Sequence, residues 1–235
     1  AFQAYLALLP PGGKAIGWGD DPRVRALLGE LSQETETYGL GEDNDWRPLD
    51  IRYDALGRGA FDLSFRGQVC CRVRMAVPGD FNVFNGLAAL AAAHSLGADM
   101  EKAAASLGRF AGAHRRFERT GEVQGVQLYH DYGHNPTEMR NALSIARLQT
   151  RRRLWAVMQP HTYSRVKRLF GDYLTCTREA DITLVTDIYA AREKDPGDIN
   201  TPMLIDGMTA HGVTAYHTPG FDETEAWLLK NGQPG

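Results

Sequence analysis

The carboxy-terminal half of the chain alternates between expected strands and expected helices, and this alternation constrains the fold more than any other feature. The expected elements are, in order, strand 126–129, helix 136–148, strand 154–158, helix 164–178, strand 182–186, helix 201–211, strand 213–216 and helix 221–229. Strands that alternate with helices at this spacing form a parallel sheet with helices packed on its faces. The sequence therefore predicts a parallel, doubly wound sheet in this region.

Residues 34–77 follow a different pattern, in which every second residue tends to be apolar and Gly or Asp separates the runs. The runs are Thr35–Tyr38, Ile51–Tyr53, Phe61–Phe65 and Cys71–Met75. A period of two is typical of antiparallel strands. Around this sheet the sequence predicts a short strand over 14–18 and helices over 2–9, 22 to about 31, 83–96 and 99–110.

The change of pattern near residues 111–113 indicates two domains. At about 100–200 residues per domain, 235 residues are enough for one large domain or two small ones. We expect residues 1–113 to form an α/β domain with a mixed sheet that contains antiparallel strands. Residues 114–235 are expected to form a second α/β domain around the parallel sheet.

Composition and charge exclude several classes of protein. With 43% apolar residues the chain is expected to bury a sizeable core, and its net charge of −3 argues against a nucleic-acid partner. The longest apolar run, Leu87–Ala93, is far shorter than the roughly 20 residues of a membrane helix. Three cysteines make neither a disulfide framework nor a zinc motif, so we interpret them as reduced thiols of a cytoplasmic protein.

Two asparagines lie three residues apart near the expected start of the helix at 83–96. This spacing places Asn82 and Asn85 on one face of the helix. A carboxamide offers a donor and an acceptor side by side, which complements the edge of an adenine. The alternative is that Asn82 caps the helix and Asn85 is solvated, and the spacing alone leaves both interpretations open.

Arg115 and Arg116 follow the expected domain boundary. Guanidinium groups bind phosphate in a forked geometry, so paired arginines at this place suit a polyphosphate ligand. A surface salt bridge to Glu118 is the alternative.

Polar side chains follow three successive strands of the predicted parallel sheet. They are Asp131, Tyr132 and His134 after the first strand, His161 and Arg165 after the second, and the segment 186–194 after the third. The carboxyl ends of strands form the ligand crevice in open α/β sheets, and successive strands usually lie side by side. We therefore expect one crevice lined by these residues, in which Arg165 faces an anion such as a carboxylate.

The segment that begins with His130 has two further interpretations. Residues 135–138 on their own are typical of a helix start, with Asn or Thr as the cap. A metal site is the other interpretation, but His130 and His134 are separated by a turn instead of lying on one helix face, so no metal site is predicted.

Several of these segments resemble motifs of the Mur ligases, the ATP-dependent amino-acid ligases of peptidoglycan synthesis. Gly79–Asn85 is similar to their adenine-contacting G-x-[HF]-N-x-x-N segment, Arg115–Glu118 to their R-R-F-[ED] linker, and Asp131–His134 to their D-Y-[GA]-H turn. Gln159–Arg165 and Asp187–Glu193 resemble the members that join L-alanine to UDP-N-acetylmuramate. The resemblance spans nearly the whole chain.

This resemblance implies a fold and a set of partners. Residues 1–113 would be the second half of a central ATPase domain, and residues 114–235 a Rossmann-like carboxy-terminal domain. The implied ligands are ATP, Mg²⁺, UDP-N-acetylmuramate and L-alanine. The sequence holds no G-x-x-x-x-G-K-[ST] phosphate loop. We therefore expect that loop and the Mg²⁺ ligands in a preceding part of the same enzyme, and no activity from this chain alone.

The resemblance also implies roles for individual residues. The implied ATP-binding residues are Asn82 and Asn85 for adenine, Arg116 for a phosphate and Asp131 for the ribose or its surroundings. The implied substrate-binding residues are Tyr132, His134, His161 and Arg165, which would meet L-alanine and the acyl phosphate, with His134 and Arg165 as catalytic residues.

Two alternative functions stay open. One is a sister ligase that takes another amino acid or a murein peptide, because Asn135 and Thr162 stand where members specific for L-alanine commonly have His and Arg. The other is a nucleotide- or amino-acid-binding module without catalysis.

Overall fold

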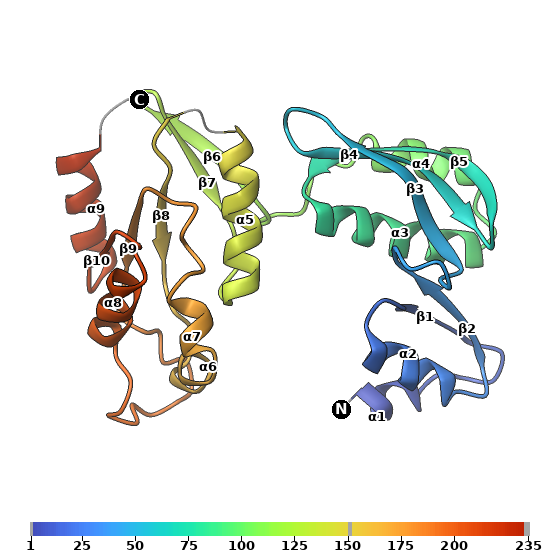
Figure 1. Cartoon of the computed structure of the whole chain (residues 1–235), viewed down its shortest axis with the longest axis horizontal. Helices are drawn as coiled ribbons and strands as arrows, with labels where there is room; N and C mark the ends of the chain where they lie inside the picture. The colour runs from blue at the N-terminus through green and yellow to red at the C-terminus, as the bar shows by residue number, and fades with distance from the viewer. Residues whose placement is uncertain (1, 150–151, 233–235) are drawn as a thin grey trace. The chain divides into compact units, whose positions relative to one another are not determined.

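The computed structural model describes residues 2–149 and 152–232, and the chain divides into two compact units (Figure 1). The first unit consists of residues 1–111 and the second of residues 112–235. The division thus falls two residues before the expected boundary. Each unit has its own hydrophobic core.

The first unit is built on a five-stranded sheet. Its strands are, in spatial order, β1 (Lys14–Trp18), β2 (Glu34–Tyr38), β3 (Trp46–Tyr53), β4 (Arg58–Phe65) and β5 (Gln68–Pro78). The sheet is mixed, as expected, because β4 pairs antiparallel with both β3 and β5. The expectation for Thr35–Tyr38 is wrong, since β2 pairs in parallel with both β1 and β3. The helix between β1 and β2 makes the crossover that a parallel pair requires.

Four helices accompany this sheet in the described residues. They are α1 (Phe2–Leu6), α2 (Pro22–Gly29), α3 (Asp80–Ser95) and α4 (Met100–Leu107). Asp99 starts α4 as expected of an N-cap, with its side chain accepting the backbone N–H of Lys102. Helix α3 contacts all five strands and buries Val83, Leu87 and Leu90 against them. Its first two turns, which carry the two asparagines, are therefore fixed to the sheet.

A buried carboxylate links the first three strands of this sheet. Glu36 on β2 is 1% exposed, and its two oxygens accept hydrogen bonds from Trp46 Nε1 at 2.7 Å and Lys14 Nζ at 2.6 Å. The bond to Glu36 raises the pKa of Lys14. A buried charge is tolerated only when its partners are complete, so this triad contributes to the stability of the sheet.

We predict that Glu36→Ala lowers the free energy of unfolding by about 3 kcal/mol, because it leaves the indole N–H buried without a partner and breaks a buried ion pair. The matched control is Glu34→Ala, which removes the exposed second partner of Lys14 and is expected to cost less than about 1 kcal/mol. Urea unfolding followed by tryptophan fluorescence measures both. Equal effects of the two variants would contradict the triad.

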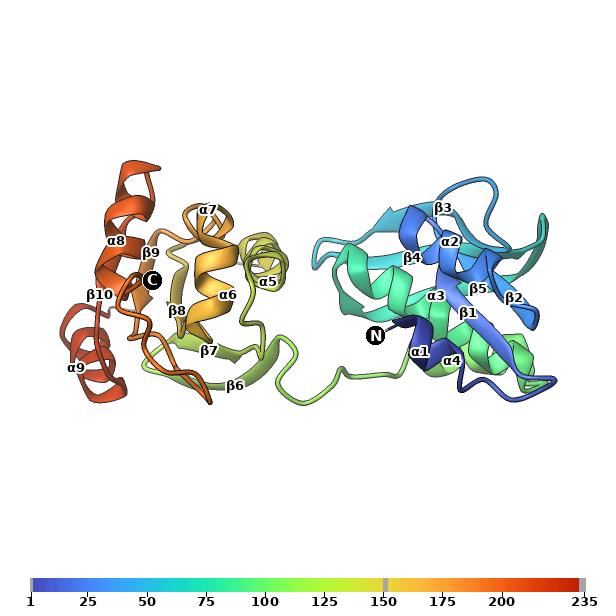
Figure 2. The ribbon, with the colours of Figure 1, turned by 90° about the horizontal axis from the view of Figure 1, so that it is seen from below.

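The second unit contains the predicted parallel sheet. Its strands are β8 (Trp155–Met158), β9 (Ile182–Val185) and β10 (Ala215–His217), in the order β10-β9-β8 and all parallel. The helices are α5 (Pro136–Gln149), α6 (Tyr163–Arg168), α7 (Phe170–Tyr173), α8 (Thr201–Ala210) and α9 (Phe221–Asn231). Helices α5 to α8 share one core with β8 and β9. Trp227 of α9 packs against Trp155 and Tyr216 of the sheet, and Figure 2 shows α9 and α5 on opposite sides of the strands.

Two expectations for this unit are wrong. The strand expected at 126–129 is present as β7 (Val126–His130), but it does not belong to the parallel sheet. It pairs with an unexpected strand, β6 (Glu118–Val123), in a separate antiparallel hairpin. Gln124 and Gly125 both have positive φ angles, 50° and 81°, as a two-residue type I′ loop requires. The helix expected at 164–178 ends at Arg168, and the short helix α7 follows after Leu169.

The cysteines and the surface add little reactive chemistry. All three thiols are free, with Cys70 exposed and its neighbour Cys71 buried. Burial raises the pKa of Cys71 to about 11 and that of Cys176 to about 12, so both stay protonated at neutral pH.

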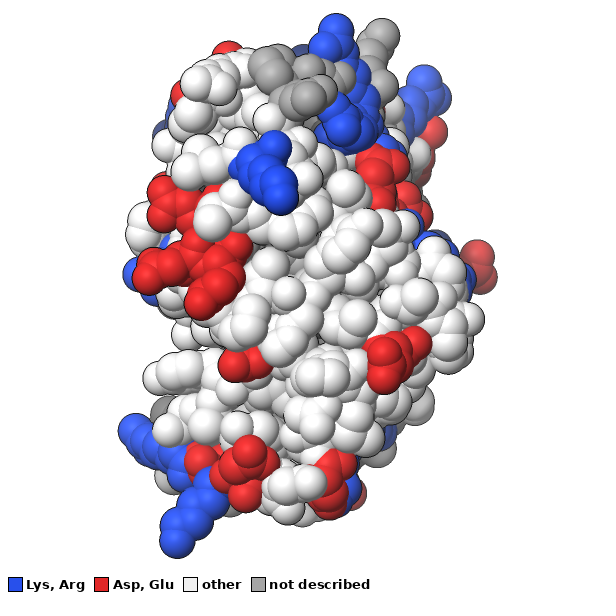
Figure 3. All heavy atoms as spheres, turned by 90° about the vertical axis from the view of Figure 1, so that its left-hand side faces the viewer, with Lys and Arg blue, Asp and Glu red and all other residues white. Residues whose placement is uncertain are grey.

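No helix among the described residues is long and apolar enough to cross a membrane. Figure 3 shows the face of the second unit that carries α8 and α9, where charged side chains form small separate groups on a largely uncharged surface.

Candidate functional site

The first two turns of α3 arrange the two asparagines as a pair. Gly79 precedes the helix with a φ of 102° and is its N-cap, so the interpretation that Asn82 caps the helix is wrong. Asn82 instead donates its amide N–H to the carbonyl oxygen of Pro78 at 2.7 Å and accepts a bond from Asn85 Nδ2 at 3.1 Å. Asn85 is exposed, and its carboxamide keeps an oxygen and one N–H for a ligand.

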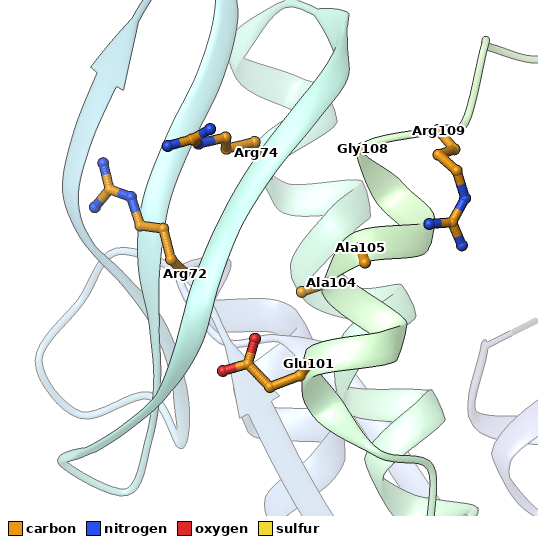
Figure 4. A pocket seen from close by; sticks show the side chains of 7 residues that line it. All are labelled: Arg72, Arg74, Glu101, Ala104, Ala105, Gly108 and Arg109. Carbon is orange, nitrogen blue, oxygen red and sulfur yellow. The ribbon is translucent and has the colours of Figure 1, made fainter.

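A cavity of about 420 Å³ lies between β5 and α4 of the same unit (Figure 4). Its lining residues are Arg72, Arg74, Glu101, Ala104, Ala105, Gly108 and Arg109. Figure 4 shows that the side chain of Arg109 points away from those of Arg72 and Arg74, so the guanidinium groups do not converge on one ligand. Arg72 already pairs with Asp62 at 2.9 Å. No predicted site residue lines this cavity.

In the second unit, Asp131 ties the segment after the domain boundary to the turn that follows β7. Its carboxylate accepts the backbone N–H of Phe117 at 2.8 Å and that of Gly133 at 2.6 Å. The backbone N–H of Tyr132 bonds to the carbonyl oxygen of Arg115 at 2.7 Å. A carboxylate has about four acceptor positions, so Asp131 can make these bonds and still accept one from a ligand.

Arg116 lies beside this turn with its guanidinium group half exposed. Its nearest acidic partner is Glu138, 3.8 Å from Nη1, and its guanidinium carbon lies 5.9 Å from the centre of the Tyr132 ring. The alternative salt bridge to Glu118 is wrong. That carboxylate accepts the backbone N–H of Arg115 and pairs with His114, and these bonds lower the pKa of Glu118. Arg116 is thus available to an anionic ligand.

The imidazole of His134 is oriented by its own backbone turn. Its Nδ1 lies 3.0 Å from the carbonyl oxygen of Tyr132, and because a carbonyl only accepts, Nδ1 carries the hydrogen. Nε2 is then left as the acceptor. The peptide groups of His134 bond to Glu138 and to the hydroxyl of Tyr173. Asn135 caps α5 by accepting the backbone N–H of Glu138, which confirms that this segment also starts the helix.

His161 and Arg165 form a second pair. Arg165 Nη1 lies 3.3 Å from His161 Nδ1, and since a guanidinium group only donates, His161 accepts through Nδ1. Burial holds the pKa of His161 below its usual range, and repulsion by the positive charge of Arg165, and by His134 whenever it is protonated, lowers this pKa further. His161 is therefore a neutral imidazole beside a permanent cation.

The segments that follow β7, β8 and β9 lie together, and rings from all three segments form one row. The ring centres lie 5.6 Å apart for Tyr132 and His134, 5.2 Å for His134 and His161, and 5.4 Å for His161 and Tyr189. Tyr189 lies in the segment 186–194, which the sequence predicts as part of the crevice, but it is not itself a predicted site residue. Glu138 and Glu193 lie in segments that the sequence analysis names, 135–138 and 186–194, but neither is predicted as a site residue, and Tyr173 is not predicted at all. Only the fold shows that these three residues hold the others in place.

No group of three or more His, Cys, Asp or Glu side chains that could hold a metal ion occurs in residues 2–149 and 152–232.

Two family models match the chain. The Mur ligase middle domain matches residues 2–93, and the Mur ligase, glutamate ligase domain matches residues 115–235, more than half of the chain. The chain belongs to the Mur ligase family. The glutamate ligase domain match begins at residue 115, three residues after the start of the second unit, whereas the middle-domain match ends at residue 93, inside the first unit.

The relatives of this Mur ligase are named as ligases. It is 37% identical to the UDP-N-acetylmuramate–L-alanine ligase of Caldanaerobacter subterraneus subsp. tengcongensis over 235 residues, which are 100% of this chain and 51% of that protein. The chain spans about half the length of the curated relatives it matches.

Two solved structures are also similar. The UDP-N-acetylmuramate-alanine ligase of Thermotoga maritima matches with a TM-score of 0.69 and 25% identity, covering 90% of this chain and 44% of that chain. A murein peptide ligase from Psychrobacter arcticus matches with a TM-score of 0.74 and 23% identity, covering 100% of this chain and 49% of that chain. The second likeness shows the fold alone.

We predict that Arg165→Gln raises the pKa of His161, because the amide can still donate to Nδ1 but no longer repels the imidazolium form. The matched control is Lys167→Gln, which removes a cation that the structure pairs with Asp198. An NMR pH titration of the imidazole signals measures both variants. An unchanged or lowered pKa in Arg165→Gln would show that the guanidinium group does not face His161.

Proposed function

We propose that this chain belongs to an ATP-dependent ligase that joins L-alanine to UDP-N-acetylmuramate. The observation that carries the proposal is the convergence of His134, which follows β7, with His161 and Arg165, which follow β8 of the parallel sheet. The 37% identity to a protein named for this reaction supports it.

The proposed reaction has two steps. A carboxylate oxygen of UDP-N-acetylmuramate attacks the γ-phosphorus of ATP, the bond to the bridging oxygen breaks, and ADP leaves. The amine of L-alanine then attacks the carbonyl carbon of the acyl phosphate. The carbon–oxygen bond breaks, phosphate leaves, and the proton lost by the amine passes to a base.

The second unit is proposed to bind the amino acid. Arg165 donates to its carboxylate in the forked geometry that guanidinium and carboxylate share, while its other N–H group holds His161. His134 carries its hydrogen on Nδ1, so Nε2 is free to accept the proton of the attacking amine. The rings of Tyr132 and His161 flank His134 and narrow the space for the amino-acid side chain.

Residues that contact ATP are proposed in each unit taken by itself. Residues 1–113 are interpreted as the second half of a central ATP-binding domain, in which Asn82 and Asn85 contact adenine. Residues 114–235 are interpreted as the amino-acid-binding domain, in which Arg116 contacts a phosphate and Asp131 the ribose. The matches to the middle and glutamate ligase domains support this division.

The test is phosphate release from ATP by the gene product that contains this chain, with UDP-N-acetylmuramate and one amino acid at a time. We expect release that requires L-alanine. Release that requires a murein tripeptide or another amino acid identifies a sister ligase. No release with any of them, combined with measurable ATP binding, identifies a binding module and overturns the proposal.

We predict that Arg165→Ala raises the KM for L-alanine by about a hundredfold, because a charge-assisted bidentate contact contributes roughly 3 kcal/mol. The KM for ATP is expected to change little. Lys167→Ala on the same helix is the control and should retain normal kinetics. If Arg165→Ala raises only the KM for ATP, the carboxylate contact is assigned to the wrong residue.

A second prediction concerns the adenine contact. Asn85→Ala is expected to raise the KM for ATP about tenfold, the effect of losing one to two neutral hydrogen bonds, with no change in the KM for L-alanine. Ser95→Ala, at the other end of α3, is the control, since Ser95 bonds only to the carbonyl oxygen of Ala92. Steady-state kinetics with ATP as the varied substrate gives both values, and unaltered use of ATP by Asn85→Ala would remove this residue from the site.

A further inference from the structure

The start of helix α6 lacks the local cap that its position requires. The residue at the N-cap, Thr162, makes no side-chain hydrogen bond to the helix. Its φ angle of 64° lies in the left-handed region, which is unfavourable for a β-branched residue. The first N–H groups of a helix need partners from elsewhere when no cap is present. Helix α6 carries Arg165, so what holds this turn also determines where the guanidinium group lies.

Glu193, from the loop after β9, supplies the missing partner. Its Oε2 accepts the backbone N–H of Ser164 at 2.9 Å, and its Oε1 accepts the Ser164 hydroxyl. These bonds, the hydroxyl first, lower the pKa of Glu193, so the carboxylate is charged when it caps the helix. The backbone of Glu193 is itself fixed, because its N–H donates to the carbonyl oxygen of Ala190 at 3.0 Å.

The loop after β9 is also hydrogen-bonded to the segment that follows β8, through Tyr189. Tyr189 donates its backbone N–H to Pro160 at 2.8 Å and accepts that of Thr162 at 2.9 Å. His161 lies between these two bonds, and Ser164 with Arg165 follows immediately. The Tyr189 attachment therefore holds the backbone on either side of His161, whereas Glu193 binds Ser164, the residue next to Arg165.

We propose that Glu193 is a positioning residue that fixes Arg165 and His161 for the incoming amino acid by capping α6 from the neighbouring loop. That the ligand is an amino acid rests on the proposed function, whereas the capping of α6 by Glu193 does not. Nothing in the reaction requires Glu193 to touch a substrate.

The charge of Glu193 gives a readout that mere folding would not change. Burial lowers the pKa of His161 most; Arg165, and His134 when it is protonated, lower it further, and the carboxylate of Glu193 raises it. Glu193→Gln keeps an oxygen that can accept the Ser164 N–H but removes the negative charge. We therefore expect the pKa of His161 to fall further in Glu193→Gln, while the Ser164 amide stays largely protected from hydrogen exchange.

Glu193→Ala removes both the charge and the cap. In this chain we expect the same fall in the pKa of His161 and about five- to tenfold faster exchange of the Ser164 amide, the usual effect of losing a helix cap. Asp198→Asn is the matched control, because Asp198 lies in the same loop and pairs with Lys167 of the same helix without touching Ser164. It should change neither quantity. An unchanged Ser164 exchange rate in Glu193→Ala overturns the proposal.

The kinetic arm uses the gene product that contains this chain. Glu193→Ala is expected to raise the KM for L-alanine about tenfold with the KM for ATP unchanged, and Glu193→Gln to recover most of the loss. A loss of kcat without a change in either KM contradicts the positioning role. If the exchange and titration results are as expected but no amino acid supports turnover, the proposed function fails while the cap of α6 by Glu193 stands.

Discussion

The parallel pairing of β8 and β9 continues beyond the ends of both strands, and the site in the second unit depends on this continuation. Two backbone hydrogen bonds join Tyr189 to Pro160 and Thr162, after the regular strands have ended at Met158 and Val185. They bring the ring of His161 within 5.4 Å of that of Tyr189 and within 5.2 Å of that of His134.

Hydrogen bonding then sets the electrical character of the site. His134 gives its Nδ1 hydrogen to a carbonyl oxygen, and His161 accepts from Arg165. The result is one permanent cation beside an imidazole whose pKa is held low. An amino acid presents a carboxylate and an amine that must lose a proton before it attacks, and this arrangement offers a partner for each.

The sequence predicts the parts of this fold that local patterns encode. Alternation of strands and helices predicts the parallel sheet, and Asp99 and Asn135 mark helix starts that the structure confirms. The β6–β7 hairpin was missed because Gln124-Gly125 is a weaker turn signal than Asn-Gly. The parallel pairing of β2 was missed because a period of two describes exposure and not strand direction. The roles of Asp131 and Glu193 depend on backbone groups 14 and 29 residues away, which no local pattern shows.

The most direct test of the account follows oxygen through the reaction. UDP-N-acetylmuramate labelled with ¹⁸O in its carboxylate is given to the gene product that contains this chain, together with ATP and L-alanine, and the phosphate is analysed by mass spectrometry. An acyl phosphate transfers a carboxylate oxygen to phosphorus, so the account predicts a single labelled oxygen in the phosphate that is released. Amide formation with unlabelled phosphate would contradict it.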